Sequence, residues 1–345
     1  MTRKFGLVAA FAASLTAFAA TPPAAQAQSG EEFFRGKTIT IMVGLSAGGS
    51  YDYYARFLSE FYGKHIPGNP TVLVQNRGGA GSRTAANFAY TAAPKDGTVM
   101  AMTLDTLPLY QALRGKGVRF DLNQVQWVGN MANLTAAVVV WHTSPVTTVE
   151  GLSVKEAVFG STGTSSGTYM IPTLMNGILG TKIKVVSGFP GTNQINLAME
   201  RGEVHGRAGG SWANFRIQKA DWLRDRKVIP LVQIGLTKAP DLADVPLITD
   251  LAKTDDQRKL MNLLSSASTF SRALWLPPEV PAAQVEILRR AFEATMKDPE
   301  FLAEAEKRSI LIDPMTGDVL KREIGKALDL PTALVDEARQ VLGME

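Results

Sequence analysis

The chain has 345 residues, a formal net charge of +4 and no cysteine. Its length exceeds what one hydrophobic core usually serves, which predicts two lobes. The lack of cysteine excludes disulfides, thiol nucleophiles, cysteine metal sites and a lipidated cysteine anchor, and no cluster of basic residues suggests nucleic-acid binding.

The first 27 residues predict an export signal. Arg3 and Lys4 precede an apolar run at residues 5–20, and the small-residue pattern A-Q-A follows at residues 25–27. This order is typical of a secretory signal peptide. The apolar run is shorter than a membrane span and ends before a Thr-Pro-Pro segment that breaks a helix. We therefore expect cleavage near Ala27 and release of a soluble protein into the periplasm.

Strands and helices are predicted to alternate along the chain. Residues 38–44 are β-branched and apolar and end in glycine, which predicts a buried strand, whereas Tyr54, Phe57, Leu58 and Phe61 repeat at helical spacing. Further strands are predicted at residues 71–75, 98–102, 136–141, 157–159, 182–186 and 228–236. This alternation indicates an open α/β sheet, in which ligands bind at the carboxyl ends of strands.

The predicted domain boundaries follow from this order. Residues 1–27 form the signal peptide, 28–140 the N-terminal part of lobe I, 141–240 lobe II, and 241–345 the return to lobe I with C-terminal helices. Ser144-Pro145 is the expected crossing into lobe II.

Two loops match the pattern G-x-S-x-G, at residues 44–48 and 163–167, each between a predicted strand and a predicted helix. Because a hydrolase nucleophile elbow has this setting, one alternative is a serine esterase that uses Ser165 or Ser46. Such an enzyme also needs a histidine base and an acid that orients it. Of the three histidines only His205 follows Ser165, and it follows too soon to leave room for the usual intervening strands. We therefore predict that the chain is not an enzyme.

The same two loops suit an anion. A helix N-terminus presents unpaired N–H groups and partial positive charge, and glycine lets the backbone approach a ligand closely. Two such loops at the start of separate lobes would hold a carboxylate between them, although each is also compatible with an ordinary turn. Residues 79–84 begin like a dinucleotide fingerprint, but Thr84 replaces its last glycine. We expect no cofactor and no metal.

Four motifs resemble those of one family. Residues 47–52 (AGGSYD) are similar to A-G-G-x-x-D, residues 74–81 (VQNRGGAG) to V-x-N-x-x-G-A-G, residues 93–98 (APKDGT) to A-P-x-D-G-Y/T, and residues 160–166 (GSTGTSS) to G-S-x-G-x-G-S. This ordered set resembles the Bug-type receptors, the periplasmic binding proteins of tripartite tricarboxylate transporters.

The resemblance implies a type II periplasmic-binding-protein fold of the α/β class, with two lobes, a hinge and an interlobe cleft. It implies a monomeric receptor that captures a small organic carboxylate and passes it to the membrane subunits of a transporter, with no nucleic-acid partner. The positions carried over as ligand contacts are Ser46, Ala47, Gly48, Gly49, Ser50, Ser161, Thr162, Gly163, Thr164 and Ser165. Asp52 would cap or brace the helix behind the first loop.

Two aromatic residues depart from the family's motifs and are candidate cleft residues. Tyr51 stands where the family often has a small hydroxyl residue, and Phe189 lies in a turn where the family often has P-Y-x-G. They would select the ligand, and with Tyr53 and Trp212 they could stack on an aromatic acid or pack in the core.

Two further questions stay open on the sequence. Arg77, Arg83 and Arg207 lie near glycine turns, where each could pair with a second carboxylate or lie at a solvated surface. The receptor could also be a ligand sensor for a membrane regulator rather than a transport protein.

Overall fold

The computed structural model describes residues 1–2 and 30–344. Residues 3–27 of the predicted signal peptide, which include its cleavage site, therefore lie outside the described residues. Among the described helices, none combines the length and the apolar character that crossing a membrane requires.

The first lobe is built on a six-stranded sheet with the order β11-β4-β10-β3-β1-β2. Its strands are β1 (Thr38–Val43), β2 (Thr71–Asn76), β3 (Val99–Met102), β4 (Gln126–Asn130), β10 (Ala273–Leu276) and β11 (Met315–Thr316). β1 is parallel to β2 and β3, whereas β10 is antiparallel to β3 and β4. The start of β10 therefore lies at the same edge as the ends of β1 and β3.

The second lobe has a five-stranded sheet with the order β7-β6-β8-β5-β9. Its strands are β5 (Ala136–Trp141), β6 (Ala157–Ser161), β7 (Ile183–Ser187), β8 (Gly206–Arg207) and β9 (Val228–Ile234). β6 is parallel to β7 and β8, and β5 is antiparallel to β8 and β9. The predicted α/β fold with two lobes is confirmed.

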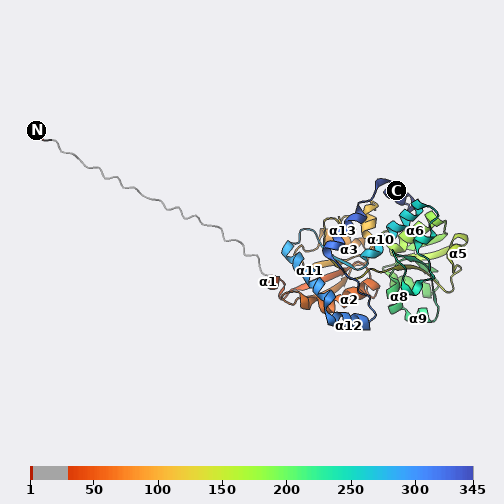
Figure 1. The fold of residues 1–345 in the computed structure, drawn as a ribbon, viewed down its shortest axis with the longest axis horizontal. Helices are drawn as coiled ribbons and strands as arrows, with labels where there is room; N and C mark the ends of the chain where they lie inside the picture. The colour runs from red at the N-terminus through yellow and green to blue at the C-terminus, as the bar shows by residue number, and fades with distance from the viewer. Residues whose placement is uncertain (3–29, 345) are drawn as a thin grey trace.

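Helices follow the strands in both halves of the molecule. The chain segments that carry the first sheet contain α1 (Gly30–Phe34), α2 (Ser50–Tyr62), η1 (Gly63–His65), α3 (Arg83–Thr91), α4 (Leu107–Ala112), α11 (Ala282–Lys297), α12 (Pro299–Lys307) and α13 (Gly317–Leu328). The others are α5 (Val149–Val154), α6 (Gly167–Leu179), α7 (Thr192–Glu200), α8 (Trp212–Gln218), α9 (Ala220–Arg224), η2 (Pro240–Leu242), η3 (Ile248–Leu251), α10 (Asp255–Ser266), η4 (Ala267–Phe270) and α14 (Thr332–Val341). Figure 1 shows α2 and the C-terminal helices α11 and α12 in one lobe, with α5, α8 and α9 in the other.

The apolar face of α2 fixes the position of the loop before it. Tyr54, Phe57, Leu58 and Phe61 are buried, as their spacing predicts, and the ring of Phe57 stacks on that of Phe301 at 4.7 Å between centroids. Burial of one such side chain stabilises the fold by about 1.5–3 kcal/mol. This packing holds the N-terminus of α2 at the edge of the sheet where β1 ends.

The chain crosses between the lobes earlier than the sequence suggested. β5 pairs with β8 and β9, so the crossing is at residues 131–135, between β4 and β5, and not at Ser144-Pro145. An apolar strand carries no local mark of which sheet accepts it. The C-terminal region differs as well: Val335 and Ala338 of α14 pack with Leu174 and Met175 of α6 in the core of the second lobe.

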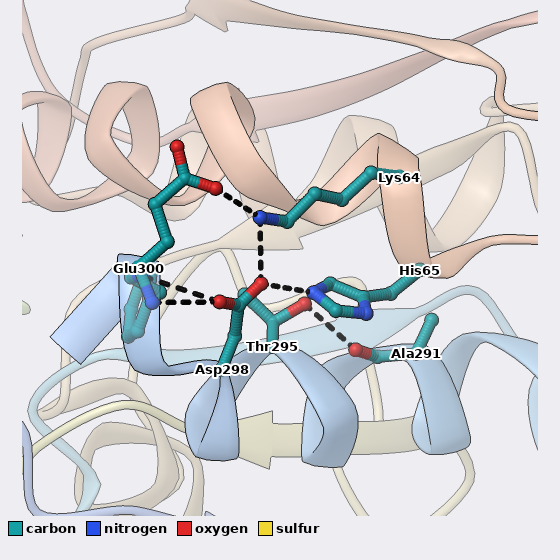
Figure 2. A network of polar contacts seen from close by, with 7 residues as sticks. Lys64, His65, Ala291, Thr295, Asp298 and Glu300 are labelled. Carbon is teal, nitrogen blue, oxygen red and sulfur yellow. Dashed lines mark hydrogen bonds and ion pairs between the residues drawn. The ribbon is translucent and has the colours of Figure 1, made fainter.

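A network of polar contacts joins η1 to the start of α12 (Figure 2). Asp298 accepts hydrogen bonds from the backbone N–H groups of Glu300 and Phe301, which makes it the N-cap of α12. Its Oδ2 lies 2.7 Å from both Nζ of Lys64 and Nε2 of His65. The hydrogen bond from Lys64, followed by that from His65, holds the pKa of Asp298 well below its usual range. His65 is therefore part of a structural contact far from either G-x-S-x-G loop.

Candidate binding site between the lobes

A cavity lies between the two lobes. Its walls include Tyr51, Asp105 and Arg272 from the first lobe and Thr162 and Ile234 from the second. Small-molecule sites in proteins commonly lie in clefts between domains, where apolar walls carry a few polar groups. The position and the lining of this cavity therefore make it the candidate ligand site.

Strand ends bring the first-lobe residues of the cavity together. Asp105 follows β3, Arg272 directly precedes β10, and Tyr51 lies in the first turn of α2. Because β10 is antiparallel to β3, with Leu274 opposite Met102, Arg272 and Asp105 meet at one edge of the sheet. This is the edge at which open α/β sheets usually bind ligands.

Arg272 is a buried cation in this cavity, with 2% of its surface exposed. Its two terminal nitrogens donate to the hydroxyl of Ser50 and the carbonyl of Ser271, and its guanidinium carbon lies 4.1 Å from the ring centre of Tyr51. Within the described part of the chain, Nε has no hydrogen-bond partner. Leaving a buried donor unsatisfied costs about 1–3 kcal/mol, more for a charged group. The described residues therefore leave one donor of this buried cation without an acceptor.

Asp105 is half-buried beside Arg272. Burial raises the pKa of its carboxyl group to about 6, although the charge of Arg272 and the hydrogen bond with Tyr51 both lower this pKa. The Tyr51 hydroxyl also accepts the backbone N–H of Asp105 at 3.1 Å. Burial, then the charge of Asp105, keeps the pKa of Tyr51 well above its ordinary value. The wall thus carries a cation, a carboxyl group that titrates near neutral pH and a neutral phenol.

The two serines of the G-x-S-x-G loops contact the opposite lobe. Ser165 Oγ lies 2.8 Å from the carbonyl oxygens of both Ala80 and Gly81, and Ser46 Oγ donates to Oε1 of Gln194 at 3.1 Å. His205, the base weighed for Ser165, instead accepts the backbone N–H of Val158 through Nδ1. The described residues therefore do not form the serine–histidine contact that an esterase requires.

Glycine makes the closest approach between the lobes. Gly163 has φ +137°, and a Cβ placed there would lie 2.7 Å from the nitrogen of Gly81 and 2.9 Å from the carbonyl carbon of Ala80. In return, the N–H of Gly81 donates to the carbonyl of Thr162 at 3.0 Å. The second-lobe loop is thus seated directly on a first-lobe turn, and the lobes are closed.

The predicted contact residues fall into three groups. Ser50, Tyr51 and Thr162 line the cavity. Ser46, Thr162, Gly163 and Phe189 line a second hollow outside the contact between the loops. The residues that line neither are Ala47, Gly48, Gly49, Asp52, Ser161, Thr164 and Ser165.

Asp52 braces the first loop from behind. Its Oδ2 accepts the N–H of Gly48 at 2.8 Å and Nε of Arg56 at 2.9 Å. Although Asp52 is only 3% exposed, the hydrogen bonds from Arg56 and Gly48 outweigh burial and lower the pKa of its carboxyl. Asp52 is therefore charged and fixes the left-handed conformation of Gly48, at φ +78°.

Known proteins share this architecture. No family model matches the sequence. A UPF0065 protein of Agrobacterium vitis is 28% identical over 297 residues, which are 84% of this chain and 79% of that protein. Among solved structures, the periplasmic binding protein BugD superposes with a TM-score of 0.69 at 16% identity, over 90% of this chain and 98% of BugD. The chain has the Bug-type fold.

A second solved structure of the Bug-type fold is of interest because of its ligand. A protein of R. palustris, solved with adipate, superposes with a TM-score of 0.67 at 18% identity, over 89% of this chain and 98% of that protein. The resemblance to Bug-type receptors that the motifs indicated is thereby confirmed at the level of the fold.

Arg207 adds a second buried cation to this Bug-type fold, so a solvated surface position, one of the two roles that the sequence left open, is wrong for it. It is 4% exposed, its Nε donates to Asn196 at 2.8 Å, and its guanidinium lies over the ring of Phe215. Burial lowers the pKa of Arg207 to about 10. Gly210 and Ser211 line both the cavity and a small hollow at Arg207, so the cation lies directly behind the cavity wall.

Two aromatic candidates of the Bug-type cleft belong to hydrophobic cores. Trp212 is buried in the second lobe, where its Nε1 donates to Asp241 at 2.8 Å, and Tyr53 packs against the core of the first lobe. Both residues therefore pack in a hydrophobic core, which was the alternative to stacking on a ligand.

Sequence reasoning missed the two charged residues of the cavity. Asp105 lies just beyond the predicted strand 98–102, at a carboxyl end, so the general rule for α/β sheets was a usable signal. Arg272 has no such signal, because only the return of the chain from the second lobe brings it beside Ser50, 222 positions away.

Proposed function

We propose that this chain is a periplasmic solute-binding receptor that holds a small organic carboxylate between its two lobes. The observation that carries the proposal is the buried guanidinium of Arg272 in the wall of the interlobe cavity, because its Nε has no hydrogen-bond partner among the described residues. A carboxylate oxygen is the acceptor that such a donor binds most strongly.

The charge around the cavity supports the same proposal. Arg272 lines it and Arg207 lies behind its wall, whereas Asp105 is the only carboxylate among the lining residues of the described chain. This excess of positive charge favours an anion, and the exclusion of water by lobe closure weakens the screening of that attraction.

The fold supports delivery rather than chemistry as the role of the chain. Closed lobes joined by crossing segments suit a receptor that captures its ligand, opens and releases it unchanged to a membrane transporter of the tripartite type. The adipate-bound protein of the same fold is consistent with an acid as cargo. We infer that the receptor acts as a monomer in the periplasm.

A thermal-shift screen of the exported protein against mono-, di-, tri- and aromatic carboxylates tests the proposal. A ligand at 100 times its Kd stabilises the folded state by about 2.7 kcal/mol, so a true ligand should stand out. Arg272→Gln should abolish the shift, whereas the matched control Arg290→Gln, at an exposed position on α11, should retain it. The proposal fails if no acid shifts the melting temperature, or if Arg272→Gln responds as the unmodified protein does.

A further inference from the structure

The two charged groups of the cavity are held close together without pairing. The ring of Tyr51 lies 4.1 Å from the guanidinium carbon of Arg272, and the hydroxyl of the same ring accepts the N–H of Asp105. Asp105 feels the charge of Arg272, yet the described residues form no ion pair between the two. Tyr51 thus acts as a spacer that presents a cation and a carboxylate side by side on one wall.

The other walls of the cavity combine apolar side chains with hydroxyl groups, such as those of Thr162, Ser166 and Thr168. They include the side chains of Leu104, Leu134, Ile171, Ile234, Leu264 and Ala267. An apolar group placed against them gains about 25 cal/mol for each Å² removed from water. A polar group there would lose its water without gaining a partner, which is costly.

A simple dicarboxylate does not fit this combination of charges. One of its carboxylates would pair with Arg272, and a second one close to the first would face the carboxylate of Asp105. Like charges at short range in a dry site repel each other strongly. Asp105 therefore discriminates against a second anionic group and favours a cationic one.

We propose, on the basis of the receptor function above, that the ligand is a zwitterionic α-amino acid with an apolar side chain. Its carboxylate binds Arg272, its ammonium group binds Asp105, and its side chain fills the apolar part of the cavity between Leu104, Ile171 and Leu264. Adjacent opposite charges on the ligand then match adjacent opposite charges on the wall.

Calorimetric titration with matched ligands tests this assignment. The series is L-leucine, 2-hydroxy-4-methylpentanoate, 4-methylpentanoate and leucinamide, with the corresponding phenylalanine series as a larger set. Each charge-assisted contact contributes about 1.5–3 kcal/mol, so the amino acid should bind roughly 10- to 150-fold more tightly than the acid that lacks the amino group or the amide that lacks the carboxylate.

Asp105→Asn separates the ammonium contact from the carboxylate contact. The variant should bind the amino acid roughly 10- to 150-fold more weakly and keep, or improve, its affinity for 4-methylpentanoate, which also reports that the variant is folded. The control Asp256→Asn, at an exposed position on α10, should change neither affinity.

Three outcomes would overturn the assignment, and one of them also removes the receptor function. If the plain acid, the hydroxy acid or a dicarboxylate binds as tightly as the amino acid, the amino-acid class is wrong while carboxylate capture stands. If Asp105→Asn leaves the affinity for the amino acid unchanged, the ammonium contact is wrong. If neither amino acids nor other carboxylates bind, both proposals fall.

Discussion

Gly163→Ala should weaken ligand binding without unfolding either lobe. The new Cβ would lie under 3.0 Å from two backbone atoms of the first-lobe turn, so backbone has to move. Overpacking of this kind typically costs about 1–3 kcal/mol. Opening of the lobes relieves the clash, so the cost of the clash falls on the closed state, whereas the strain of alanine at φ +137° is present in both states. Because affinity depends on the population of the closed state, Kd should rise roughly 5- to 150-fold.

Gly180→Ala is the matched control for this prediction. Gly180 also has a left-handed conformation, at φ +69°, and also lies in the second lobe, after α6, but a Cβ there would meet no atom within 4 Å. The control should therefore lose about 1 kcal/mol of stability and keep its Kd.

Calorimetry for Kd and small-angle X-ray scattering for lobe opening measure both effects. We expect Gly163→Ala to give a larger radius of gyration than Gly180→Ala in the presence of ligand. The reasoning is refuted if Gly163→Ala binds and closes as the unmodified protein does, or if both variants lose affinity equally.

Four other predictions concern carboxylates. The folded-state pKa of Asp298 is depressed, so Asp298 stabilises the folded protein above its ordinary pKa of 3.8, and this stabilisation is lost as the pH falls below 3.8. Asp298→Asn should therefore flatten the pH dependence of the free energy of unfolding, measured with urea, below pH 3.8. The pKa of Asp105 is raised to about 6 in the presence of Arg272 and Tyr51, so affinity for an amino acid should fall below that pH, whereas affinity for a plain acid should not. Because burial raises this pKa, the charged carboxylate of Asp105 destabilises the folded state at neutral pH. Asp105→Asn removes that charge and should raise the melting temperature of the ligand-free protein at neutral pH. Asp52→Ala should destabilise the first lobe by about 1–3 kcal/mol in urea unfolding and weaken binding through the loosened loop at Gly48, and an unchanged Kd would argue against the brace.

Local patterns predicted the elements of this fold well. A β-branched, apolar run that ends in glycine marks β1, and the spacing of Tyr54, Phe57 and Phe61 marks α2. Burial on one face of a helix imposes a period that a short window of sequence records. The assignment of β5 to a sheet was beyond such patterns, since it depends on pairing with β8 and β9 much later in the chain.

The candidate site could be predicted only in part, for the same reason. The sequence identified both loops. It did not indicate that the hydroxyl of Ser165 would donate to the carbonyl groups of Ala80 and Gly81 across the cleft. It placed Tyr51 at the cleft because of a departure from the family's motif. It gave no indication of Arg272, whose burial beside Tyr51 arises from tertiary structure alone.

A crystal structure of the exported protein with the tightest-binding acid from the screen tests the central claim most directly. We predict a carboxylate oxygen of the ligand within hydrogen-bonding distance of Nε of Arg272, in the cavity between the closed lobes. A ligand bound instead in the outer hollow at Ser46 and Phe189, with Arg272 Nε still unpaired, would contradict the account.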